Sequence, residues 1–416
     1  MITMQDKKMD YIIQLINDLN QIQDLDILLE KILQKARLFF NADAGSIYLH
    51  HGSELRFSYT QNDTLQKRLG KGKKLIYRTF SIPINKRSIA GYVAERCLKG
   101  DRGVTLNIPD VYKLDDLLPY SFNSSFDKKA GYRTQSMLTV PMTNQKNELM
   151  GVLQLINAKD KKGEVIPFSR SDEPYILHFA EAAALALERA QMTRNIILRM
   201  IRMAELRDPK ETGTHVNRVG GYSVEIFEAW ARKKGLDEDE IDKKRDILRM
   251  AAMVHDIGKV GISDSILKKP GRLTQEEYEA MKVHTYLGAR LFYQDQQSEF
   301  DLAAAEVALN HHERWDGKGY PGHIHPVTGK PIPGFEENGR ARPKRGEEIP
   351  IFGRIVAIAD VYDALSSKRS YKEAWPEEKV YQEIERGAGT QFDPDMVEAF
   401  FSCQETLKAI AKKYEE

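Results

Sequence analysis

Residues 311–322 read HHERWDGKGYPG, and they combine two adjacent histidines with three glycines and a proline. No other part of the chain has this density of imidazole and flexible backbone. Buried polar groups need partners, and two consecutive histidines at a helix end suit a pair of metal ions better than a hydrophobic core. The stretch therefore predicts a helical domain built around a metal centre.

Histidines elsewhere in the chain support that prediction. Of the ten histidines, seven lie after residue 210, and most stand on or at the end of predicted amphipathic helices. A lone histidine in this setting is more often a core residue than a ligand. Several buried histidines in one all-α domain are harder to explain as core residues, because the backbone groups that could bond to them are already used in helical hydrogen bonds. A multinuclear centre would satisfy the whole set, which comprises His215, His255, Asp256, His284, His311, His312 and Asp360, with Asp363 nearby.

Spacing and ligand type narrow the prediction. His255 and Asp256 are adjacent, and on a helix their side chains would project about 100° apart. They would then hold neighbouring metal ions, with the two oxygens of Asp256 bridging them. His311 and His312 repeat this arrangement. All candidate ligands offer nitrogen or oxygen, which indicates iron, manganese or zinc rather than a thiolate site.

The 416-residue chain is long enough for two domains and a connector. Residues 1–171 begin with helical apolar spacing, and from about residue 44 they continue as short runs such as SMLTVPM and MGVLQLIN. These runs predict an antiparallel sheet flanked by helices, an α+β domain. Residues 172–206 predict one long connector helix, which Asp208-Pro209 should end. Residues 207–416 predict an all-helical bundle, so the fold class is multidomain, α+β followed by all-α.

Two features stand out in the predicted bundle. Thr274 and Glu277 precede an apolar run with the spacing of a capping box, which predicts a helix start. Residues 322–349 are rich in proline and glycine and predict a long irregular loop that contains His323 and His325. Extra metal ligands are one interpretation of these histidines, and a mobile surface loop is the preferred one.

The connector has apolar or small residues in alternating steps of three and four, which is the spacing of a heptad seam. One interpretation is a helix packed on its own domain, and the other is parallel pairing with a second copy of the chain. We expect the second, a homodimer. The seam positions are Ile176, Phe179, Ala183, Ala186, Ala190, Thr193, Ile197, Met200 and Ala204.

Charge and cysteine content argue against several classes of protein. Lys and Arg number 62 against 61 Asp and Glu, a formal net charge of +1, which does not favour a nucleic-acid binder. Cys97 and Cys403 provide neither a disulfide framework nor a thiolate cage. No segment has the length and apolar character of a signal peptide or a membrane span. We therefore expect a cytoplasmic protein.

Several of these motifs resemble a known family. HDIGK at residues 255–259 is similar to the HDxGK signature of HD-domain phosphohydrolases, and HHERWDGKGYP contains the HHE and GYP elements of the HD-GYP family. ETGTH, HDIGK, His284, HHERWDGKGYP and ADVYDAL followed by KRSYK occur in the family's order. The resemblance implies an HD-type bundle and a metal-dependent bacterial phosphodiesterase. Such an enzyme hydrolyses cyclic di-GMP to pGpG, GMP or both, and some members act on related cyclic dinucleotides.

The same resemblance implies roles for individual residues. His215, His255, Asp256 and Asp360 would form the basic metal site, and His284, His311 and His312 would complete a second site that shares Asp256. Glu211 stands where trimetal members have a glutamate ligand, so two or three ions are expected, iron first and manganese as the alternative. Lys259 would join His255 and Asp256 in catalysis by neutralising the phosphate. The substrate would contact Tyr320, Arg369 and Lys372.

The N-terminal domain resembles GAF sensor domains. NIPDV, FDKKAGYRTQSMLTVPM and GVLQLINAKDKKGEVIPFSRSDE match that family. The spaced NKxF and DE pattern of the GAF subset in cyclic-nucleotide phosphodiesterases and cyclases is present. This pattern is largely structural, so a cyclic nucleotide is one candidate ligand, and a module that dimerises or binds another small molecule is the other. The pattern residues are Asn157, Lys159, Phe168, Asp172 and Glu173.

Partners and alternatives follow from these resemblances. Cyclic di-GMP is the expected substrate, and the GYP region is a candidate contact for a diguanylate cyclase. A competing hypothesis is a non-hydrolysing receptor or partner-binding module, which would be expected to lack one or more metal ligands. Another is an HD phosphohydrolase for mononucleotides, which the GYP element and the layout of sensor and long helix disfavour. Trp315 would either stack on guanine or anchor its loop.

Overall fold

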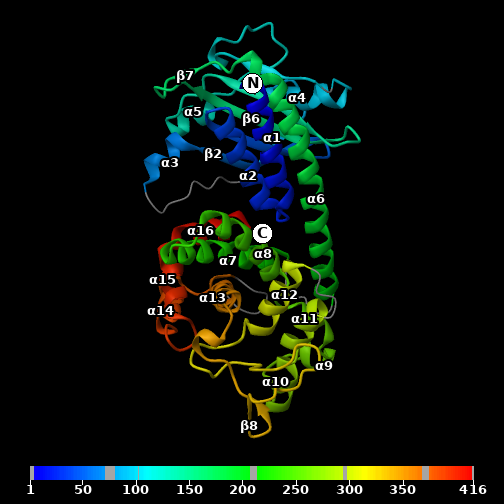
Figure 1. Cartoon of the computed structure of the whole chain (residues 1–416), viewed down its shortest axis with the longest axis vertical. Helices are drawn as coiled ribbons and strands as arrows, with labels where there is room; N and C mark the ends of the chain where they lie inside the picture. The colour runs from blue at the N-terminus through cyan, green and yellow to red at the C-terminus, as the bar shows by residue number, and fades with distance from the viewer. Residues whose placement is uncertain are drawn as a thin grey trace. The chain divides into compact units, whose positions relative to one another are not determined.

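The computed structural model describes residues 4–70, 80–101, 103–206, 213–293, 298–367 and 374–414 (Figure 1). The chain forms two compact units, Met1–Arg194 and Asn195–Glu416, and helix α6 (Glu173–Glu205) continues from one into the other. Each unit has its own hydrophobic core. Among the residues described, none of the helices is long and apolar enough to cross a membrane.

The first unit is built on a single antiparallel sheet, as predicted. Its strands lie in the order β3-β2-β1-β6-β5-β4, and β7 pairs with β6. The central strand is buried on both faces, because Val152 and Leu153 of β6 belong to different hydrophobic clusters. The strands are β1 (Ala42–His51), β2 (Glu54–Asn62), β3 (Ser81–Pro83), β4 (Leu106–Ile108), β5 (Met137–Thr143), β6 (Leu149–Lys159) and β7 (Val165–Ile166).

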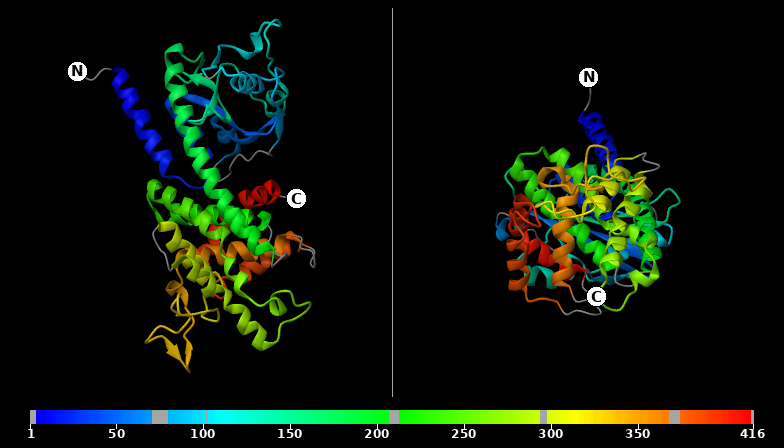
Figure 2. Two further views of the ribbon diagram at one scale, coloured as in Figure 1. Left: turned by 90° about the vertical axis from the view of Figure 1, so that its right-hand side faces the viewer. Right: turned by 90° about the horizontal axis from the view of Figure 1, so that it is seen from below.

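Helices cover both faces of this sheet. Residues of α1 (Met4–Gln21), α2 (Leu25–Phe39) and α6 pack on one face, and α4 (Ile89–Leu98) packs on the other (Figures 1 and 2). The prediction of an antiparallel sheet flanked by helices is therefore confirmed. Shorter elements complete the unit, namely α3 (Asp63–Leu69), α5 (Ser125–Ala130), η1 (Val111–Lys113) and η2 (Arg170–Asp172).

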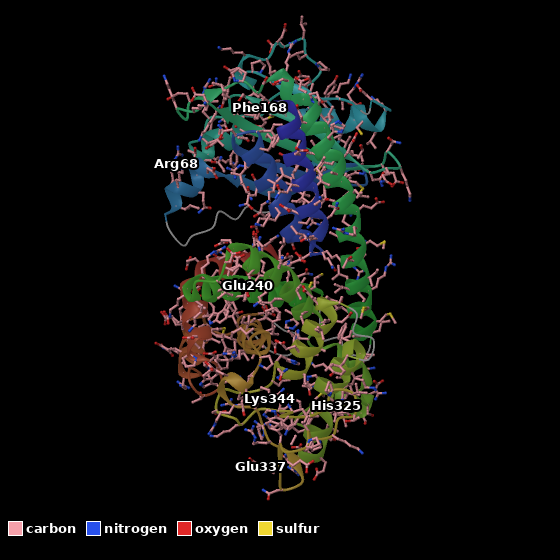
Figure 3. The ribbon with its side chains drawn as sticks, in the orientation of Figure 1. Arg68, Phe168, Glu240, His325, Glu337 and Lys344 are labelled. Carbon is pink, nitrogen blue, oxygen red and sulfur yellow. The ribbon has the colours of Figure 1, made fainter. Side chains whose placement is uncertain are left out.

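Residues of the NKxF and DE pattern make structural contacts. The Lys159 ammonium pairs with the buried Asp43, which joins β6 to β1. The side chain of Asn157 accepts from the backbone of Gln135 at 2.7 Å and donates to the hydroxyl of Tyr132 at 2.9 Å. Phe168, labelled in Figure 3, is buried in the core. The fold itself therefore accounts for these parts of the pattern.

The second unit is helical, which confirms the predicted bundle. Thr274 and Glu277 form the capping box that the sequence predicts. The helices are α7 (Gly213–Lys234), α8 (Glu238–Met253), α9 (Asp264–Leu267), α10 (Gln275–Lys282), α11 (His284–Tyr293), α12 (Glu299–Asn310), α13 (Ile351–Ser366), α14 (Glu377–Arg386), α15 (Pro394–Ser402) and α16 (Gln404–Lys413), with 3-10 turns η3 (Ile257–Gly261) and η4 (Gly346–Glu348).

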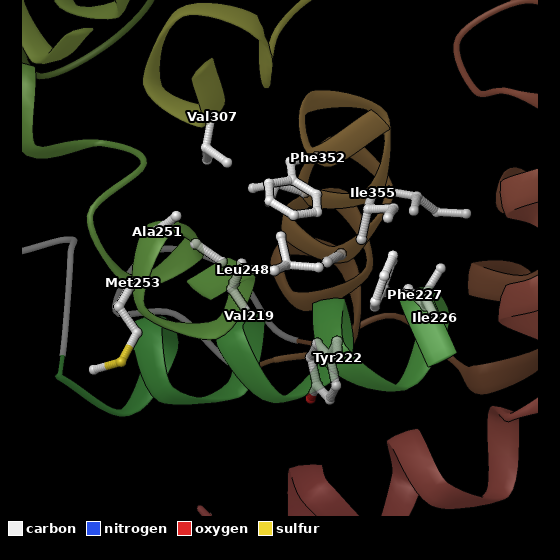
Figure 4. Packing of buried hydrophobic residues seen from close by; sticks show 14 of the residues in the cluster. Val219, Tyr222, Ile226, Phe227, Leu248, Ala251, Met253, Val307, Phe352 and Ile355 are labelled. Carbon is white, nitrogen blue, oxygen red and sulfur yellow. The ribbon is translucent and has the colours of Figure 1, made fainter. Parts of the chain in front are cut away.

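A buried aromatic contact joins two helices that bear candidate metal ligands. Phe227 of α7 meets Phe352 of α13 edge to face, with ring centroids 6.0 Å apart (Figure 4). Both side chains belong to the large core of the second unit. Since α7 carries His215 and α13 carries Asp360, this contact helps to hold together the two helices that bear these candidate ligands.

The loop at residues 322–349 is more structured than predicted. It contains a small hairpin of β8 (Glu336–Glu337) and β9 (Arg340–Ala341), and Glu337 lies near its tip (Figure 3). His323 stacks on Phe335, with ring centroids 4.2 Å apart, and Arg342 pairs with Glu348 at 2.6 Å. The prediction of an irregular loop is therefore corrected in part. Within the described residues, neither His323 nor His325 belongs to a group of metal-ligand geometry.

The predicted seam of the connector faces the chain's own cores. Ile176, Phe179 and Ala183 lie in the core of the first unit, and Ile197 lies in that of the second. Each is at most 5% exposed, so these residues are not available to a second copy of the chain. The interpretation of a helix packed on its own domains is the one that the structure shows. A different face of α6 is exposed, and its large apolar residues are Leu185, Met192, Ile196 and Met203, with the exposed Leu206 directly after the helix.

We predict that Phe227→Ala lowers the free energy of unfolding of the second unit by about 3–5 kcal/mol, because it leaves a cavity between α7 and α13. Phe227→Leu should lower it less, since most of the apolar volume remains. All three tryptophans, Trp230, Trp315 and Trp375, lie in the second unit. Tryptophan fluorescence during urea denaturation therefore reports on that unit.

The matched control is Phe179→Ala, which removes an equally buried ring from the first unit. It should move the tryptophan transition far less than Phe227→Ala does. Equal midpoints for wild type and Phe227→Ala would contradict the prediction.

Candidate metal centre

Most candidate ligands follow directly after the end of a helix. His255 and Asp256 lie in a turn beyond α8, and His284 begins α11 immediately after α10. His311 caps the C-terminus of α12, and His312 follows it. His255 and Asp256 thus lie at the end of a helix, which is one of the two predicted positions, but the predicted helical projection of about 100° does not apply because α8 ends at Met253. The two remaining candidates lie within helices, His215 in α7 and Asp360 in α13.

The seven side chains form two groups. One comprises Asp256, His284, His311 and His312, the other His215, His255 and Asp360, and within each group the ligand atoms lie within 4.8 Å of one another. Asp256 faces both groups. Its Oδ1 is 3.2 Å from Nε2 of His284 and 3.5 Å from Nε2 of His311, and its Oδ2 is 3.3 Å from Nε2 of His255. The carboxylate therefore has one oxygen near each group.

Hydrogen bonds at Nδ1 orient the imidazole rings. Nδ1 of His255 lies 2.8 Å from the carbonyl of Ala252, and Nδ1 of His284 lies 2.7 Å from that of Met281. His311 meets the carbonyls of Val307 and Ala308 at 3.1 and 3.0 Å. A carbonyl only accepts, so each Nδ1 carries the proton and each Nε2 offers its lone pair. The carbonyls come from the last turns of helices, and that of Val307 also accepts from the backbone N–H of His311 at 3.1 Å.

A metal ion would satisfy atoms that the described part of the chain leaves without a hydrogen bond. Nε2 of His284, Nε2 of His311 and Oδ1 of Asp256 are buried and have no hydrogen-bond partner among the described residues. A buried acceptor without a partner costs about 1–3 kcal/mol. Cations bound among these atoms would remove that cost for several of them at once. The donor set of imidazole nitrogens and carboxylate oxygens therefore fits a transition-metal centre.

Asp363 supports the second group from behind. Its Oδ2 lies 2.8 Å from Nδ1 of His215, and Arg218 donates to both carboxylate oxygens at 2.6 and 3.0 Å. Burial alone would raise the pKa of Asp363, but His215 and Arg218 hold it below its ordinary value. The motif pattern assigns no role to Asp363. Its position three residues after Asp360, on the same helix face, is the signal for it.

Electrostatics favour the protonation states that metal ligands need. Burial would raise the pKa of Asp256, but Lys259 and His255 hold it well below its ordinary value. The Lys259 ammonium lies 2.7 Å from Oδ2 of Asp256. Burial, reinforced by neighbouring imidazoles, lowers the pKa of His311 and that of His312. Anionic carboxylate and neutral imidazole are the forms that bind metal.

The GYP element lies against the first group. The ring of Tyr320 is 4.9 Å from that of His312, so Tyr320 lies beside the first group. Glu313 is buried and accepts from the backbone of Gly322 at 2.6 Å, and burial raises its pKa to about 7. Lys344, labelled in Figure 3, donates to Asn310 at the end of α12. These bonds attach the 322–349 loop to the helix that ends in the histidine pair, a role that sequence reasoning missed.

The structure describes only one of the four remaining candidate residues. Arg354 lies over the ring of Trp315 at 5.7 Å, and the carbonyl of Trp315 accepts from Gly346, which favours the anchoring interpretation. Glu211, Arg369 and Lys372 lie outside the residues that the structure describes.

Comparison with known families and proteins agrees with this architecture. Residues 24–187 match the GAF domain model and residues 212–365 match the HD domain model, so the chain contains a GAF domain followed by an HD domain. A Vibrio cholerae protein named cyclic di-GMP phosphodiesterase is 38% identical over 229 residues, which cover 54% of this chain and 42% of that protein. A Thermotoga maritima protein of the same name is 39% identical over 211 residues, covering 51% and 49%.

A third relative has a different substrate in its name. The Vibrio cholerae 3'3'-cGAMP-specific phosphodiesterase 2 is 36% identical over 226 residues, covering 54% of this chain and 38% of that protein. The match therefore spans less than half of the length of these three curated relatives.

We predict that Asp363→Asn weakens metal affinity about 10- to 100-fold, because the charge that holds Nδ1 of His215 is lost. The measurement is competition with a chelator during titration of manganese into metal-free protein. Asp393→Asn is the matched control, since Asp393 is also buried and paired with an arginine, Arg354, at 2.7 Å. The control should bind metal like wild type, and equal affinity in Asp363→Asn and wild type would contradict the prediction.

Proposed function

We propose that this chain, in which a GAF domain precedes an HD domain, hydrolyses cyclic di-GMP to pGpG, GMP or both. The observation that carries the proposal is the carboxylate of Asp256 between two histidine-rich groups whose Nε2 atoms face it. Phosphodiester hydrolysis needs positive charge around phosphorus and a nucleophile at neutral pH, and paired ions provide both. The names of the relatives from Vibrio cholerae and Thermotoga maritima support the choice of substrate.

The proposed metal content is two or three transition-metal ions, with iron preferred and manganese as the alternative. Nitrogen and oxygen ligands support either metal. His215, His255 and Asp360 would hold one ion, Asp256, His284, His311 and His312 another. Glu211 would add a ligand for a third ion and stays a prediction, because it lies outside the described residues.

Several residues of this chain act on the substrate in the proposed mechanism. When bound, the metal ions would neutralise the phosphate and lower the pKa of a water molecule to about neutrality. Lys259 holds the carboxylate of Asp256 in its anionic form and adds positive charge where the phosphate develops negative charge. The ring of Tyr320 lies beside His312, and in the proposed mechanism Tyr320 orients the substrate. Arg369 and Lys372 are proposed to bind its phosphates.

An enzyme is favoured over a non-hydrolysing receptor. A receptor would be expected to lack metal ligands, but His215, His255, His284, His311, His312, Asp256 and Asp360 all take part in the two groups. The relative specific for 3'3'-cGAMP makes a related cyclic dinucleotide the second candidate substrate. The contact between the GYP region and a diguanylate cyclase stays a prediction, as does a cyclic nucleotide in the GAF domain.

We predict that anaerobically purified, metal-loaded protein converts cyclic di-GMP to linear products. Chromatography of the reaction mixture measures the conversion. Chelation should abolish turnover, and re-addition of iron or manganese should restore it. Asp256→Ala should reduce kcat at least 1,000-fold, on the order of 4 kcal/mol, because one ligand shared by both groups is lost. Intact substrate after hours with fully metal-loaded wild type would overturn the proposal.

We also propose that the chain forms a homodimer through the exposed face of α6. The apolar residues Leu185, Met192, Ile196 and Met203 of this face, and Leu206 directly after the helix, follow one another at intervals of 7, 4, 7 and 3 residues. Such intervals keep these side chains on one seam between two supercoiled helices, with Arg189 and Arg199 at the seam positions in between. The partner is therefore a second copy, whose identical stripe is complementary to the first. Since α6 continues from the first unit into the second, this seam also offers a route for sensor control.

We predict that Met192→Glu combined with Ile196→Glu converts the dimer to a monomer, because like charges would face each other across the seam. Multi-angle light scattering at micromolar concentration measures the change in mass. Leu291→Glu on α11 is the matched control, since Leu291 is 53% exposed but lies off the stripe. A monomeric wild type at that concentration would contradict the proposed homodimer.

A further inference from the structure

A line of rings leads from the metal centre to the surface. The ring of His312 lies 4.9 Å from that of Tyr320, and Tyr320 lies 6.1 Å from Tyr278 at an interplanar angle of 81°. Tyr278 belongs to α10, the helix that ends just before His284. Its side chain is 42% exposed although it touches Tyr320. An aromatic surface therefore borders the site and remains accessible to a ligand.

A lysine holds the same surface in place. Nζ of Lys282 lies 4.8 Å from the ring centre of Tyr278 and 5.4 Å from that of Tyr320. An ammonium over two aromatic faces is attracted by both rings. One of its three donors binds Glu279 at 2.8 Å. Lys282 therefore brings positive charge and further donors to the ring line, two residues before the predicted metal ligand His284.

Helix α10 presents these side chains rigidly. Its first turn is closed by the capping box of Thr274 and Glu277, and Glu277 also pairs with Lys269 at 2.6 Å. Tyr278 and Lys282 are four residues apart, so they lie on the same side of the helix. A fixed platform loses little entropy when a ligand binds to it.

We propose that Tyr278 and Lys282 form a subsite for one purine base of the cyclic dinucleotide, and this inference rests on the proposed function. Every nucleobase has a π-face that stacks on an exposed aromatic ring. Guanine presents two acceptors, O6 and N7, on one edge, whereas adenine presents a donor beside N7. Lys282 has donors only, so it favours guanine. Tyr278 thus supplies affinity for the base, and Lys282 supplies the preference for guanine over adenine.

The test measures binding separately from turnover. The probe is a phosphorothioate analogue of cyclic di-GMP that resists hydrolysis, titrated calorimetrically into metal-loaded full-length protein. Tyr278→Ala should raise its Kd about 5- to 150-fold, the equivalent of about 1–3 kcal/mol, and Tyr278→Phe should keep wild-type affinity because the ring remains. Lys282→Met should reduce the preference for this analogue over the matching cyclic di-AMP analogue about tenfold.

Controls show whether the metal centre is intact. The amount of bound metal per protein, measured by elemental analysis, should be the same in wild type and Tyr278→Ala, because Tyr278 belongs to neither group of candidate ligands. Phe126→Ala removes a ring of similar exposure, 43%, from the GAF domain and should leave the Kd unchanged. The inference is overturned if the analogue fails to bind wild type, or if Tyr278→Ala binds it within twofold of wild type. A wrong proposed function would give a different result: wild type would not hydrolyse cyclic di-GMP, while the effects of the substitutions on binding would persist.

Discussion

The metal centre depends on one kind of hydrogen bond, from an imidazole Nδ1 to a carbonyl at the end of a helix. A helix leaves its last carbonyls without intrahelical partners, and a histidine placed just beyond the end can use them. His255, His284 and His311 do so at the ends of α8, α10 and α12. Each bond fixes both the ring orientation and the nitrogen that carries the proton. Three helices therefore have to end at one place, and the packing of the second unit follows from this requirement.

Long-range contacts complete what the helix ends begin. His215 has its Nδ1 bonded to Asp363 of α13 instead of a carbonyl, and Arg218 holds that carboxylate from the other side. The edge-to-face contact of Phe227 and Phe352 keeps α7 and α13 at the spacing this network needs. Hydrophobic packing and metal-ligand geometry are thus connected through the same two helices. A change in the core of the second unit would reach the ligands through this connection.

The sequence allowed the fold class and a set of candidate ligands to be proposed, because periodicity and the clustering of histidines are local signals, whereas the division of that set between two sites came from the family resemblance. Predictions from the sequence were wrong where two different structures have the same local pattern. Steps of three and four along α6 describe a seam, but they do not distinguish a partner chain from the chain's own core, which buries Phe179 and Ile197. The adjacency of His255 and Asp256 likewise fits either a helix or the turn that is found. The role of Asp363, which the sequence places near the ligand set, and the roles of Glu313 and Tyr278 were missed because their contacts come from residues far away in the sequence.

The orientation of the histidines by backbone carbonyls also bears on which ion the protein acquires. The carbonyls that hold the rings of His255, His284 and His311 belong to helices of the second unit, so these rings keep their orientation whichever ion is bound. Ligands held in fixed positions favour ions whose radius and coordination geometry match their spacing. Among the ions that fit, nitrogen and oxygen donors bind divalent first-row ions in an order set by the ions themselves. Cellular supply at the time of synthesis would then decide between the ions that fit, and protein from different growth media would differ in its metal.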